Sequence, residues 1–317
     1  MSNAIVGIDL GGTNAQGAAL VNGKLSESKA IPTRARQGPE AIMDDLADLA
    51  HELAAGAPLA AVGLGVPGLL DLERGVCVFS GNLNWREFPI VEKLEQRLGA
   101  SVFIDNDVRV AALGELSQGK AQGCRDFIYL TVGTGIGSGI FIDGRLLRGP
   151  RWSAGEVGHM VLNPHGPDCT CGSRGCLEAL AAAPAIARDG RKAAARYPES
   201  LLNEMSAGDP NRIDAALVSR ATDAGDAIAR QVFAEAMDWL GIGIANLVNI
   251  FNPELVVIGG GVSLAGEKLL TPVGAKIEQY SMPVQKQNVR LELSALADKA
   301  GVYGALELAT RQTTDKE

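Results

Sequence analysis

The feature that most constrains the fold is a glycine-rich turn between two strand-like runs, which occurs once in each half of the chain. Residues 8–14 read Ile-Asp-Leu-Gly-Gly-Thr-Asn, and residues 131–137 read Thr-Val-Gly-Thr-Gly-Ile-Gly. Each turn follows one apolar run of strand character and precedes another. The repetition predicts two related lobes that face each other, with a ligand-binding cleft between them.

Hydrophobic periodicity divides the rest of the chain into the strands and helices of an α/β protein. Apolar runs predict strands at residues 4–10, 61–66, 102–104, 126–132, 255–258 and 289–293. Asn22-Gly23 predicts a hairpin that joins residues 16–21 to 24–31. Helical spacing marks residues 40–55, 89–98, 108–116, most of 177–251, and 300–308.

Composition and charge argue against several classes of protein. The chain has 317 residues, 46% of them hydrophobic, which is enough for two domains. A formal net charge of −8 without basic runs disfavours a nucleic-acid or anionic-membrane surface. No apolar stretch reaches the ~20 residues that span a bilayer, and nothing like a signal peptide precedes the first strand. We therefore expect a cytoplasmic protein that binds neither nucleic acid nor membrane.

One histidine and three cysteines lie in a short window with the spacing His-x9-Cys-x-Cys-x4-Cys. They are His159, Cys169, Cys171 and Cys176. One imidazole and three thiolates make the tetrahedral ligand set of a closed structural zinc site. Gly172 and Gly175 would let the chain turn tightly enough for the sulfur atoms to meet one ion. His165 is a competing fourth ligand because it lies in the same window.

The other two cysteines, Cys77 and Cys124, are scattered, and we expect them to be ordinary reduced thiols on surface loops. An odd count of five cysteines, with no signal peptide, disfavours a disulfide framework. The spacing of the cluster also differs from the paired C-x2-C knuckles of common zinc fingers, so zinc here does not imply nucleic-acid binding.

The two glycine-rich turns are candidate phosphate-binding loops. In the first, Asp9–Asn14, glycines let backbone N–H groups approach phosphate oxygens, Thr13 adds a hydroxyl donor, and Asp9 can hold a hydrated Mg²⁺. The second loop, residues 131–139, offers the same groups from the other lobe. A P-loop motif is absent from the sequence, which excludes that class of nucleotide-binding enzyme.

A third glycine run, Gly259-Gly260-Gly261, follows a predicted strand. Position 264 is leucine where a dinucleotide fingerprint requires its third glycine, so the run is not such a fingerprint. Two interpretations stay open: a bare backbone ledge beside a flat purine, or a tight turn between a strand and a helix.

Asp107 is the candidate general base, because it opens a helix directly after a strand and its carboxylate should face the cleft. Transfer of a phosphoryl group to an alcohol requires a carboxylate that accepts the hydroxyl proton. A helix N-cap is the alternative role for Asp107. A mixed polar set suited to a polyhydroxylated ligand is formed by Asn82, Asn106, Glu156, His159 and Glu178. Trp85 is either a platform for a sugar ring or a core residue.

Taken together, these motifs resemble the ROK family (repressors, open reading frames and sugar kinases), over essentially the whole chain. The matching motifs occur in family order and are Asp-Leu-Gly-Gly-Thr-Asn (9–14), Val-Pro-Gly (66–68), Asn-Leu-Asn-Trp (82–85), Asn-Asp (106–107), Gly-Thr-Gly-Ile-Gly-Ser-Gly (133–139), Gly-Glu-Val-Gly-His (155–159), the three cysteines, and Gly-Gly-Gly (259–261). The resemblance implies a two-lobed α/β fold of the actin-like ATPase (ribonuclease H-like) type, with an interlobe cleft and a zinc-binding loop.

In such a fold we expect a smaller N-terminal lobe at residues 1–118, with a C-terminal helix at about 300–317 packing back on it. The larger lobe would span residues 119–299 and carry the zinc loop and the adenosine site. Family members are commonly dimers or tetramers, so the resemblance also implies a homodimer or homotetramer.

The resemblance also implies roles for individual residues. Asp107 would take the proton of the sugar 6-hydroxyl. The sugar would be bound by Gly68, Asn82, Asn106, Asp107, Glu156, His159 and Glu178. ATP, with Mg²⁺ on its phosphates, would be bound by Asp9, Gly11, Gly12, Thr13, Asn14, Gly133, Thr134, Gly135, Gly260 and Gly261. Structural Zn²⁺ would be held by His159, Cys169, Cys171 and Cys176, with the second nitrogen of His159 directed at the sugar.

Within the family, the polar set most resembles that of the glucokinases, which implies ATP-dependent phosphorylation of glucose at the 6-hydroxyl. Kinases of N-acetylmannosamine or N-acetylglucosamine share almost every polar contact and are the alternative. Family repressors carry an additional N-terminal DNA-binding module, for which the sequence before Asp9 leaves no room. A non-catalytic sugar sensor is the alternative from another class, and the presence of Asp9, Thr13, Asp107 and Thr134 argues against it.

Overall fold

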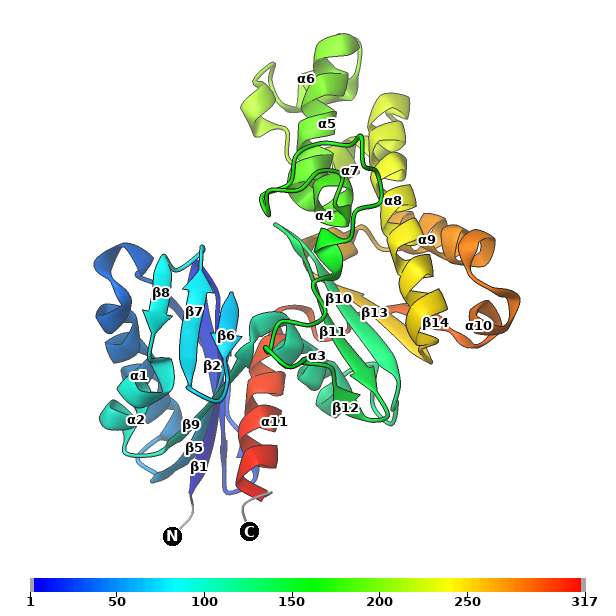
Figure 1. Cartoon of the computed structure of the whole chain (residues 1–317). Helices are drawn as coiled ribbons and strands as arrows, with labels where there is room; N and C mark the ends of the chain where they lie inside the picture. Colours follow the sequence, from blue (N-terminus) through cyan, green and yellow to red (C-terminus); the bar gives the residue numbers. More distant parts are fainter. Residues whose placement is uncertain (1–2, 315–317) are drawn as a thin grey trace.

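The computed structural model describes residues 3–314, which form two α/β lobes side by side (Figure 1). The sheet of the first lobe contains β1 (Ala4–Leu10), β2 (Asn14–Val21), β3 (Lys24–Leu25), β4 (Lys29–Pro32), β5 (Leu59–Val66) and β9 (Ser101–Asn106). The sheet of the second lobe contains β10 (Phe127–Val132), β11 (Ile136–Ile142), β12 (Arg145–Leu146), β13 (Leu255–Gly259) and β14 (Arg290–Leu293).

The two sheets have the same topology. The first has the order β3-β2-β1-β5-β9 and the second the order β12-β11-β10-β13-β14. In each, the central strand is antiparallel to the strand that follows it and parallel to the next one across (β5 or β13). This shared order confirms that the repeated glycine-rich turn marks two related lobes.

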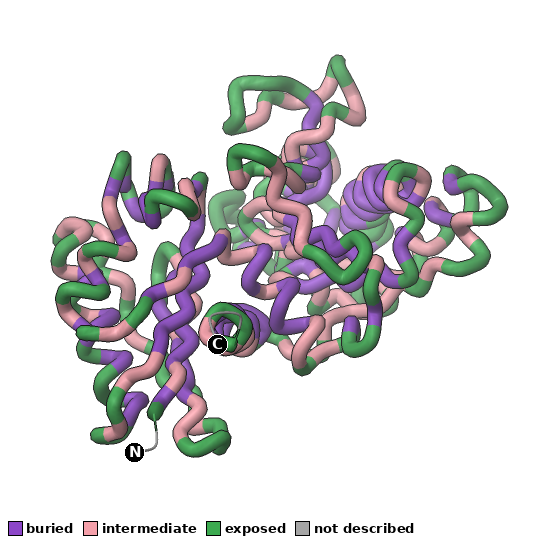
Figure 2. The backbone as a smooth tube through the Cα atoms, turned by 60° about the horizontal axis from the view of Figure 1, so that its bottom comes forward, coloured by how far each residue is buried: buried purple, intermediate pink, exposed green. Residues whose placement is uncertain are grey.

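Helices cover the outer face of each sheet and fill the space between the two sheets. In the first lobe, α1 (Pro39–Ala54) and α2 (Ile90–Leu98) pack on the outer face. In the second lobe, the outer layer consists of α4 (Leu177–Ala181), α5 (Ala183–Arg196), α6 (Leu201–Met205), α7 (Ala215–Asp223), α8 (Ala227–Phe251), α9 (Glu267–Tyr280) and α10 (Pro283–Asn288). Figure 2 shows that buried residues follow the strands and the inward sides of these helices.

Two helices, α3 (Asp107–Gln118) and α11 (Ala300–Thr314), lie between the sheets and join the lobes (Figure 1). They cross so closely that a Cβ atom at Gly304 would lie 1.6 Å from the carbonyl oxygen of Val110. A Cβ at Gly114 would lie 2.0 Å from the carbonyl oxygen of Ala300. Glycine is therefore required at both crossing points. Helix α11 packs on β1 and β5, as expected for the C-terminal helix, although residues 315–317 lie outside the described part of the chain.

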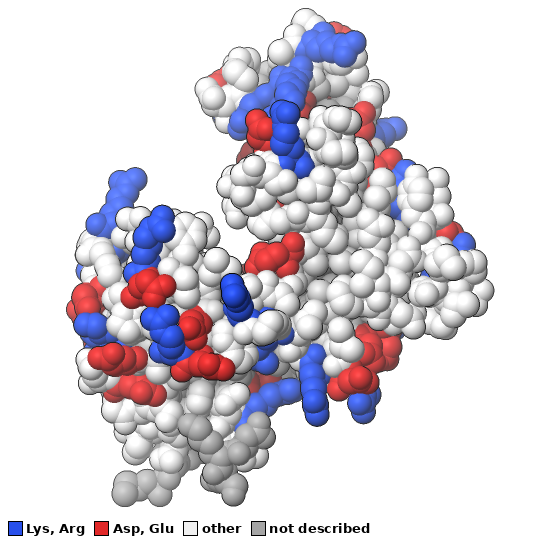
Figure 3. Space-filling model, in the orientation of Figure 1, with Lys and Arg blue, Asp and Glu red and all other residues white. Residues whose placement is uncertain are grey.

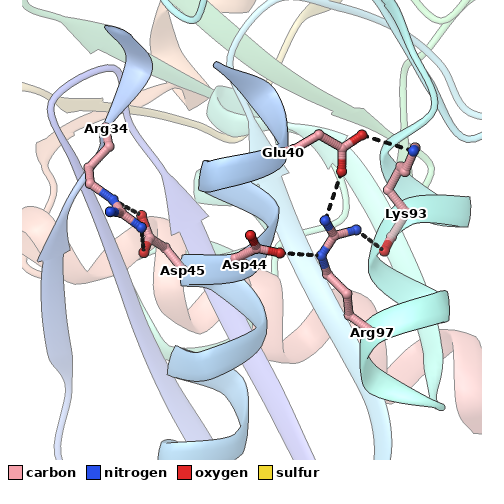
Figure 4. Close-up of polar contacts among 6 residues, drawn as sticks. All are labelled: Arg34, Glu40, Asp44, Asp45, Lys93 and Arg97. Carbon is pink, nitrogen blue, oxygen red and sulfur yellow. Dashed lines mark hydrogen bonds and ion pairs between the residues drawn. The ribbon is translucent and has the colours of Figure 1, made fainter. Parts of the chain in front are cut away.

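An exposed ion-pair network connects α1 and α2 (Figure 4). Arg97 donates to Asp44 and to Glu40, each at 2.7 Å, and Lys93 lies 2.8 Å from Glu40. Exposed pairs of this kind contribute about 0–1 kcal/mol each. The buried apolar faces of α1 and α2, rather than these charges, hold the two helices on the sheet.

Some expectations from the sequence are confirmed and others are wrong. Asn22 and Gly23 form the predicted turn with positive φ, but the strand after them breaks at Leu25 and resumes as β4. A third, antiparallel sheet of β6 (Leu69–Asp71), β7 (Val76–Ser80) and β8 (Trp85–Phe88) had no expected counterpart. Cys77 and Cys124 are buried free thiols, so their expected place on surface loops is wrong. Among residues 3–314, no helix is long and apolar enough to cross a membrane.

Candidate active site

A cavity of about 780 Å³ lies between the two lobes. The first lobe contributes Gly68, Asn82, Asn106 and Asp107 to its lining, and the second contributes Gly133, Thr134, Gly135, Glu156, His159, Glu178, Gly260 and Gly261. Figure 3 shows a deep indentation between the lobes, with acidic side chains on one wall. The structure thus brings together all the residues that the sequence singled out for sugar binding, and half of those singled out for ATP.

Asp107 begins α3 directly after β9 and lines this cavity. The N-cap is its neighbour: the side-chain oxygen of Asn106 accepts from the backbone N–H groups of Val108 (3.1 Å) and Arg109 (3.4 Å). The amide nitrogen of Asn106 donates to the carbonyl of Gly68 at 3.3 Å. Capping by Asn106 removes the main alternative role for Asp107 and leaves its carboxylate for chemistry.

Burial raises the pKa of Asp107 above its ordinary value, although the N–H of Val108, 3.0 Å from one carboxylate oxygen, and the nearby Arg109 oppose this shift. A raised pKa strengthens a carboxylate as a proton acceptor, provided that it is still ionised at the working pH. The position and environment of Asp107 therefore suit a general base.

Asp9, at the end of β1, is the second carboxylate beside the cleft. Burial, with a smaller contribution from the charge of Asp107, raises the pKa of Asp9 to about 7. Helix α11 passes so close that a Cβ at Gly301 would lie 2.1 Å from a carboxylate oxygen of Asp9. Two carboxylates whose charges repel each other would both be stabilised by a divalent cation.

The first glycine-rich loop borders the cavity rather than lining it. Thr33 fixes two of its carbonyl groups: the hydroxyl of Thr33 donates to the carbonyl of Gly11 (2.8 Å), and the N–H of Thr33 donates to the carbonyl of Thr13 (2.7 Å). A Cβ at Gly12 would lie 3.2 Å from the Cβ of Asn82, which places the loop against the cavity wall. The structure therefore brings the expected ATP residues of this loop (Asp9, Gly11, Gly12, Thr13 and Asn14) beside the cavity lining, but not into it.

The second glycine-rich loop lines the cavity and is fixed by Glu178. One carboxylate oxygen of Glu178 accepts from the backbone N–H of Ile136 at 2.9 Å. A Cβ at Gly135 would lie 2.5 Å from the same oxygen, so a larger residue there would displace the Glu178 carboxylate. Glu178 lies two residues after Cys176. The hydrogen bond of Glu178 therefore connects the cysteine-rich loop to the second glycine-rich loop.

The His/Cys cluster has the geometry of a tetrahedral metal site. The ligand atoms of His159, Cys169, Cys171 and Cys176 all lie within 4.8 Å of one another. The sulfur atoms of Cys171 and Cys176 are 3.7 Å apart, and that of Cys169 is 3.6 Å from Nδ1 of His159. Zinc–sulfur bonds of ~2.3 Å in a tetrahedron separate two sulfurs by about 3.8 Å, so the donor set fits Zn²⁺. His165 lies outside the cluster, and its expected competition for the fourth position is wrong.

A tight backbone turn brings the cysteines of this loop together. Gly172 and Gly175 both have positive φ, as their predicted role requires. A Cβ at Gly175 would lie 1.5 Å from the carbonyl oxygen of Asn163, because the two segments are hydrogen-bonded there. His159 lines both the cluster and the cavity, so its side chain connects the two.

The third glycine run connects the main cavity to a second cavity of about 540 Å³. Gly261 lines both cavities, and the second has apolar walls that include Ala215, Phe233 and Val262. Gly260, at φ 83°, packs against the carbonyl of Val132, which makes the run a tight turn. The tight-turn interpretation is therefore confirmed at Gly260, and a purine site beside Gly261 stays a prediction.

Sequence reasoning missed one aromatic residue of the site. Trp85, considered as a platform for a sugar ring, is only 2% exposed and belongs to the core. Phe79, on β7, instead lines the cavity and is 39% exposed, with the guanidinium carbon of Arg86 4.8 Å from its ring centroid. Residues 76–80 (Val-Cys-Val-Phe-Ser) carry no alternation of apolar and polar residues, so no signal in the sequence marked the exposed position of Phe79.

Two sheets of identical order, enclosing a polar cleft between them, define the class: this is the fold of the actin-like ATPases. The crystal structure of a ROK family glucokinase from Streptomyces griseus, in complex with glucose and AMPPNP, is similar to this chain with a TM-score of 0.83. The two are 34% identical, and the similarity covers 98% of this chain and 100% of that one. The model of the ROK family matches residues 5–312, and the chain belongs to this family.

Sequence relatives agree over nearly the full length. The glucokinase of Thermotoga maritima is 38% identical over 306 residues, which are 96% of this chain and 96% of that protein. The glucokinase of Halalkalibacterium halodurans is 37% identical over 319 residues, 98% of this chain and 96% of that protein. A xylose repressor of Caldicellulosiruptor bescii is 37% identical over 247 residues, 78% of this chain but 61% of the repressor.

Proposed function

We propose that this chain transfers the γ-phosphoryl group of ATP to the 6-hydroxyl of glucose, with Asp107 as the general base. The observation that carries the proposal is the position of Asp107 in a cavity that has a sugar-type polar set around it and a glycine-threonine loop opposite. Full-length similarity to glucokinases supports both the enzyme class and the sugar.

On the sugar side, Asn82, Asn106 and Glu156 offer donors and acceptors for ring hydroxyls. Gly68 is already joined to the same wall through its hydrogen bond with Asn106. Asp107 would accept the proton of the sugar 6-hydroxyl. The hydroxyl oxygen would attack the γ-phosphorus of ATP in line with the leaving oxygen of ADP. His159 and Glu178 would complete the set from the second lobe.

On the nucleotide side, the backbone of Gly133, Thr134 and Gly135 would contact the phosphates, with Gly11–Asn14 approaching from the opposite lobe. The second cavity, entered past Gly261, has the apolar walls that suit a purine. Asp9, together with the ATP phosphates, would hold Mg²⁺, which supplies charge neutralisation on the phosphates.

We assign the His/Cys cluster to structural Zn²⁺, because its ligand atoms match that ion in number, type and spacing. Nδ1 of His159 is the nitrogen near the sulfur of Cys169, which leaves Nε2 for the sugar. Zinc would then orient a substrate contact as well as the loop.

We also propose a cellular location, an oligomeric state and lobe boundaries for this chain. Free thiols belong to reducing compartments, which supports a cytoplasmic location. A homodimer or homotetramer is proposed from the family resemblance alone. We propose lobe boundaries at 1–118 with α11, and 119–299, because the sheet strands fall within 4–106 and 127–293.

Two other functions compete with this one. A kinase of N-acetylmannosamine or N-acetylglucosamine would use the same base and loops and would differ in the space beside the sugar C2 atom. A non-catalytic sugar sensor would need neither Asp107 nor the proposed cation site at Asp9, and the presence of Asp107 in the cavity with Asp9 close enough to interact with it favours the enzyme.

The direct test is to identify the product formed from glucose and Mg-ATP by phosphorus NMR. We expect glucose 6-phosphate from the wild type. Asp107→Asn should bind glucose with nearly unchanged affinity in calorimetry but lose ~10²–10⁴ in kcat, the usual contribution of a general base. Full activity of this variant would remove Asp107 from the role of base, and a different phosphorylated position would overturn the proposed regiochemistry.

A further inference from the structure

A buried carboxylate beside the cleft connects the two lobes. Asp105, on β9 of the first lobe, is 0% exposed. One of its oxygens accepts from Nε of Arg148 at 2.8 Å, and the other accepts from the backbone N–H of Asn106 at 2.8 Å and lies 3.2 Å from Nε of Arg109. Arg148 follows β12 and therefore belongs to the second lobe.

Each partner of the Arg148–Asp105 pair lies close along the chain to residues of the candidate active site. Asp105 precedes Asn106 and Asp107 on the same strand end. On the other side, the carbonyl of Arg148 accepts from the N–H of Ala154 at 3.0 Å, which closes the 148–154 turn. The carbonyl of Gly155 then accepts from the hydroxyl of Ser138 at 2.7 Å, immediately before Glu156.

The burial of the carboxylate distinguishes this pair from the surface network of Figure 4: the side chain of Asp105 is 0% exposed, whereas those of Glu40 and Asp44 are 52% and 63% exposed. Arg109 is 4% exposed, and Asp105, with a carboxylate oxygen 3.2 Å from its Nε, is its principal counter-charge. Removal of Asp105 would deprive this buried guanidinium of its main counter-charge. Removal of Arg148, whose side chain is 28% exposed, leaves Asp105 paired with Arg109 and is the milder change.

We propose that Arg148 is a positioning residue for sugar binding: its ion pair with Asp105 holds the 148–156 segment, and with it Glu156, against the strand end that carries Asn106 and Asp107. The functional part of this inference depends on the proposed sugar kinase activity. Asp107 itself is fixed by α3 and by the Asn106 cap, which do not involve Arg148. Loss of the pair should therefore weaken sugar binding more than it slows phosphoryl transfer.

The contact can be tested without any substrate, by amide hydrogen exchange over residues 149–156. Arg148→Gln should increase exchange there by about tenfold, the size of a typical coupling between sites. Arg151→Gln is the matched control, because Arg151 is an exposed arginine in the same segment, and it should leave exchange unchanged. Exchange in Arg148→Gln that equals the wild-type rate would overturn the proposed contact.

The functional consequence is tested by steady-state kinetics on the same variants. Arg148→Gln should raise the KM for glucose about tenfold, with the KM for ATP unchanged and kcat within about threefold of wild type. Arg148→Lys should recover part of the loss, since it restores the charge without the planar fork. Equal losses for glucose and ATP, or the same effect in Arg151→Gln, would overturn the positioning role. A wild type that phosphorylates no sugar would instead refute the proposed function, and the exchange experiment would still decide the contact.

Discussion

At the scale of single residues, the candidate site depends on which side chain satisfies which backbone group. Asn106 caps α3, so Asp107 is not consumed by helix capping, although both residues could have filled that role. Glu178 uses one oxygen to hold the second glycine-rich loop, and its other oxygen lies 3.4 Å from the hydroxyl of Thr170. Asp107 accepts one backbone hydrogen bond, from Val108, and its other carboxylate oxygen has no hydrogen bond to the other described residues, so that oxygen is available to accept a proton.

The raised pKa of Asp9 predicts a pH-dependent cost in stability. Its pKa rises from the ordinary 3.8 to about 7 in the folded protein, so the folded state keeps a proton that the unfolded chain has lost. The cost is absent below about pH 4, grows up to about pH 7 and is complete above it. Without Mg²⁺ and nucleotide, Asp9→Asn should therefore raise Tm at pH 8, and the gain should shrink towards pH 5 in thermal melts.

Asp143→Asn is the control for this prediction, because Asp143 is 83% exposed and lies at a turn position that asparagine tolerates. Its Tm difference from wild type should not vary with pH. A pH-independent gain in Asp9→Asn would show that the ionisation of Asp9 is not the cause.

Residue types and spacing predicted most of the candidate site but not its exact contacts. The choice between His159 and His165 as metal ligand depends on the turn at Gly175, which brings Cys176 next to Val161. Phe79, and not Trp85, lies at the cavity wall because of which faces of β7 and β8 meet the core. Both are tertiary facts that one segment of sequence does not contain.

At the scale of elements, the proposed zinc site predicts that the order of the cysteine-rich loop depends on the metal. Cys171→Ser should abolish stoichiometric zinc, measured by atomic emission, because one of four ligands is lost. It should also raise the KM for glucose, because His159 and Glu178 flank the loop and line the cavity.

Cys124→Ser is the matched control for the zinc loop, because Cys124 is a buried free thiol outside the cluster. It should lower Tm modestly while zinc content and KM stay at wild-type values. A zinc-free Cys171→Ser protein with an unchanged KM for glucose would contradict the link between the metal and the sugar site.

Elements with strong periodicity or a specific turn were predictable, and short pleated strands were not. Residues 4–10 are β1 as expected, and α8 buries Met237, Leu240 and Ile244 on one side as their spacing predicts. The sheet of β6, β7 and β8 escaped prediction because its strands are only three to five residues long. Its pairing is specified by contacts with the first lobe rather than by local pattern.

At the scale of the whole molecule, two lobes of common topology are joined by α3 and α11, and the cleft lies between them. The repeated glycine-threonine turn made this architecture predictable, because each turn marks the same position in its sheet. The close crossing at Gly114 and Gly304 was not predictable, since glycine at those positions has meaning only once the two helices are known to touch.

The substrate is a property of the whole cleft, and the most direct test of the account is a comparison of kcat/KM across sugars in a coupled ADP-release assay with Mg-ATP. The sugars are glucose, mannose, fructose, N-acetylglucosamine and N-acetylmannosamine. We predict a preference for glucose of about tenfold or more, the discrimination expected from a pocket that fits or rejects one added group. A preference for an N-acetyl sugar would contradict glucose as the substrate while leaving Asp107 as the base. Absence of turnover with every sugar, from protein that holds zinc, would contradict the assignment as a kinase.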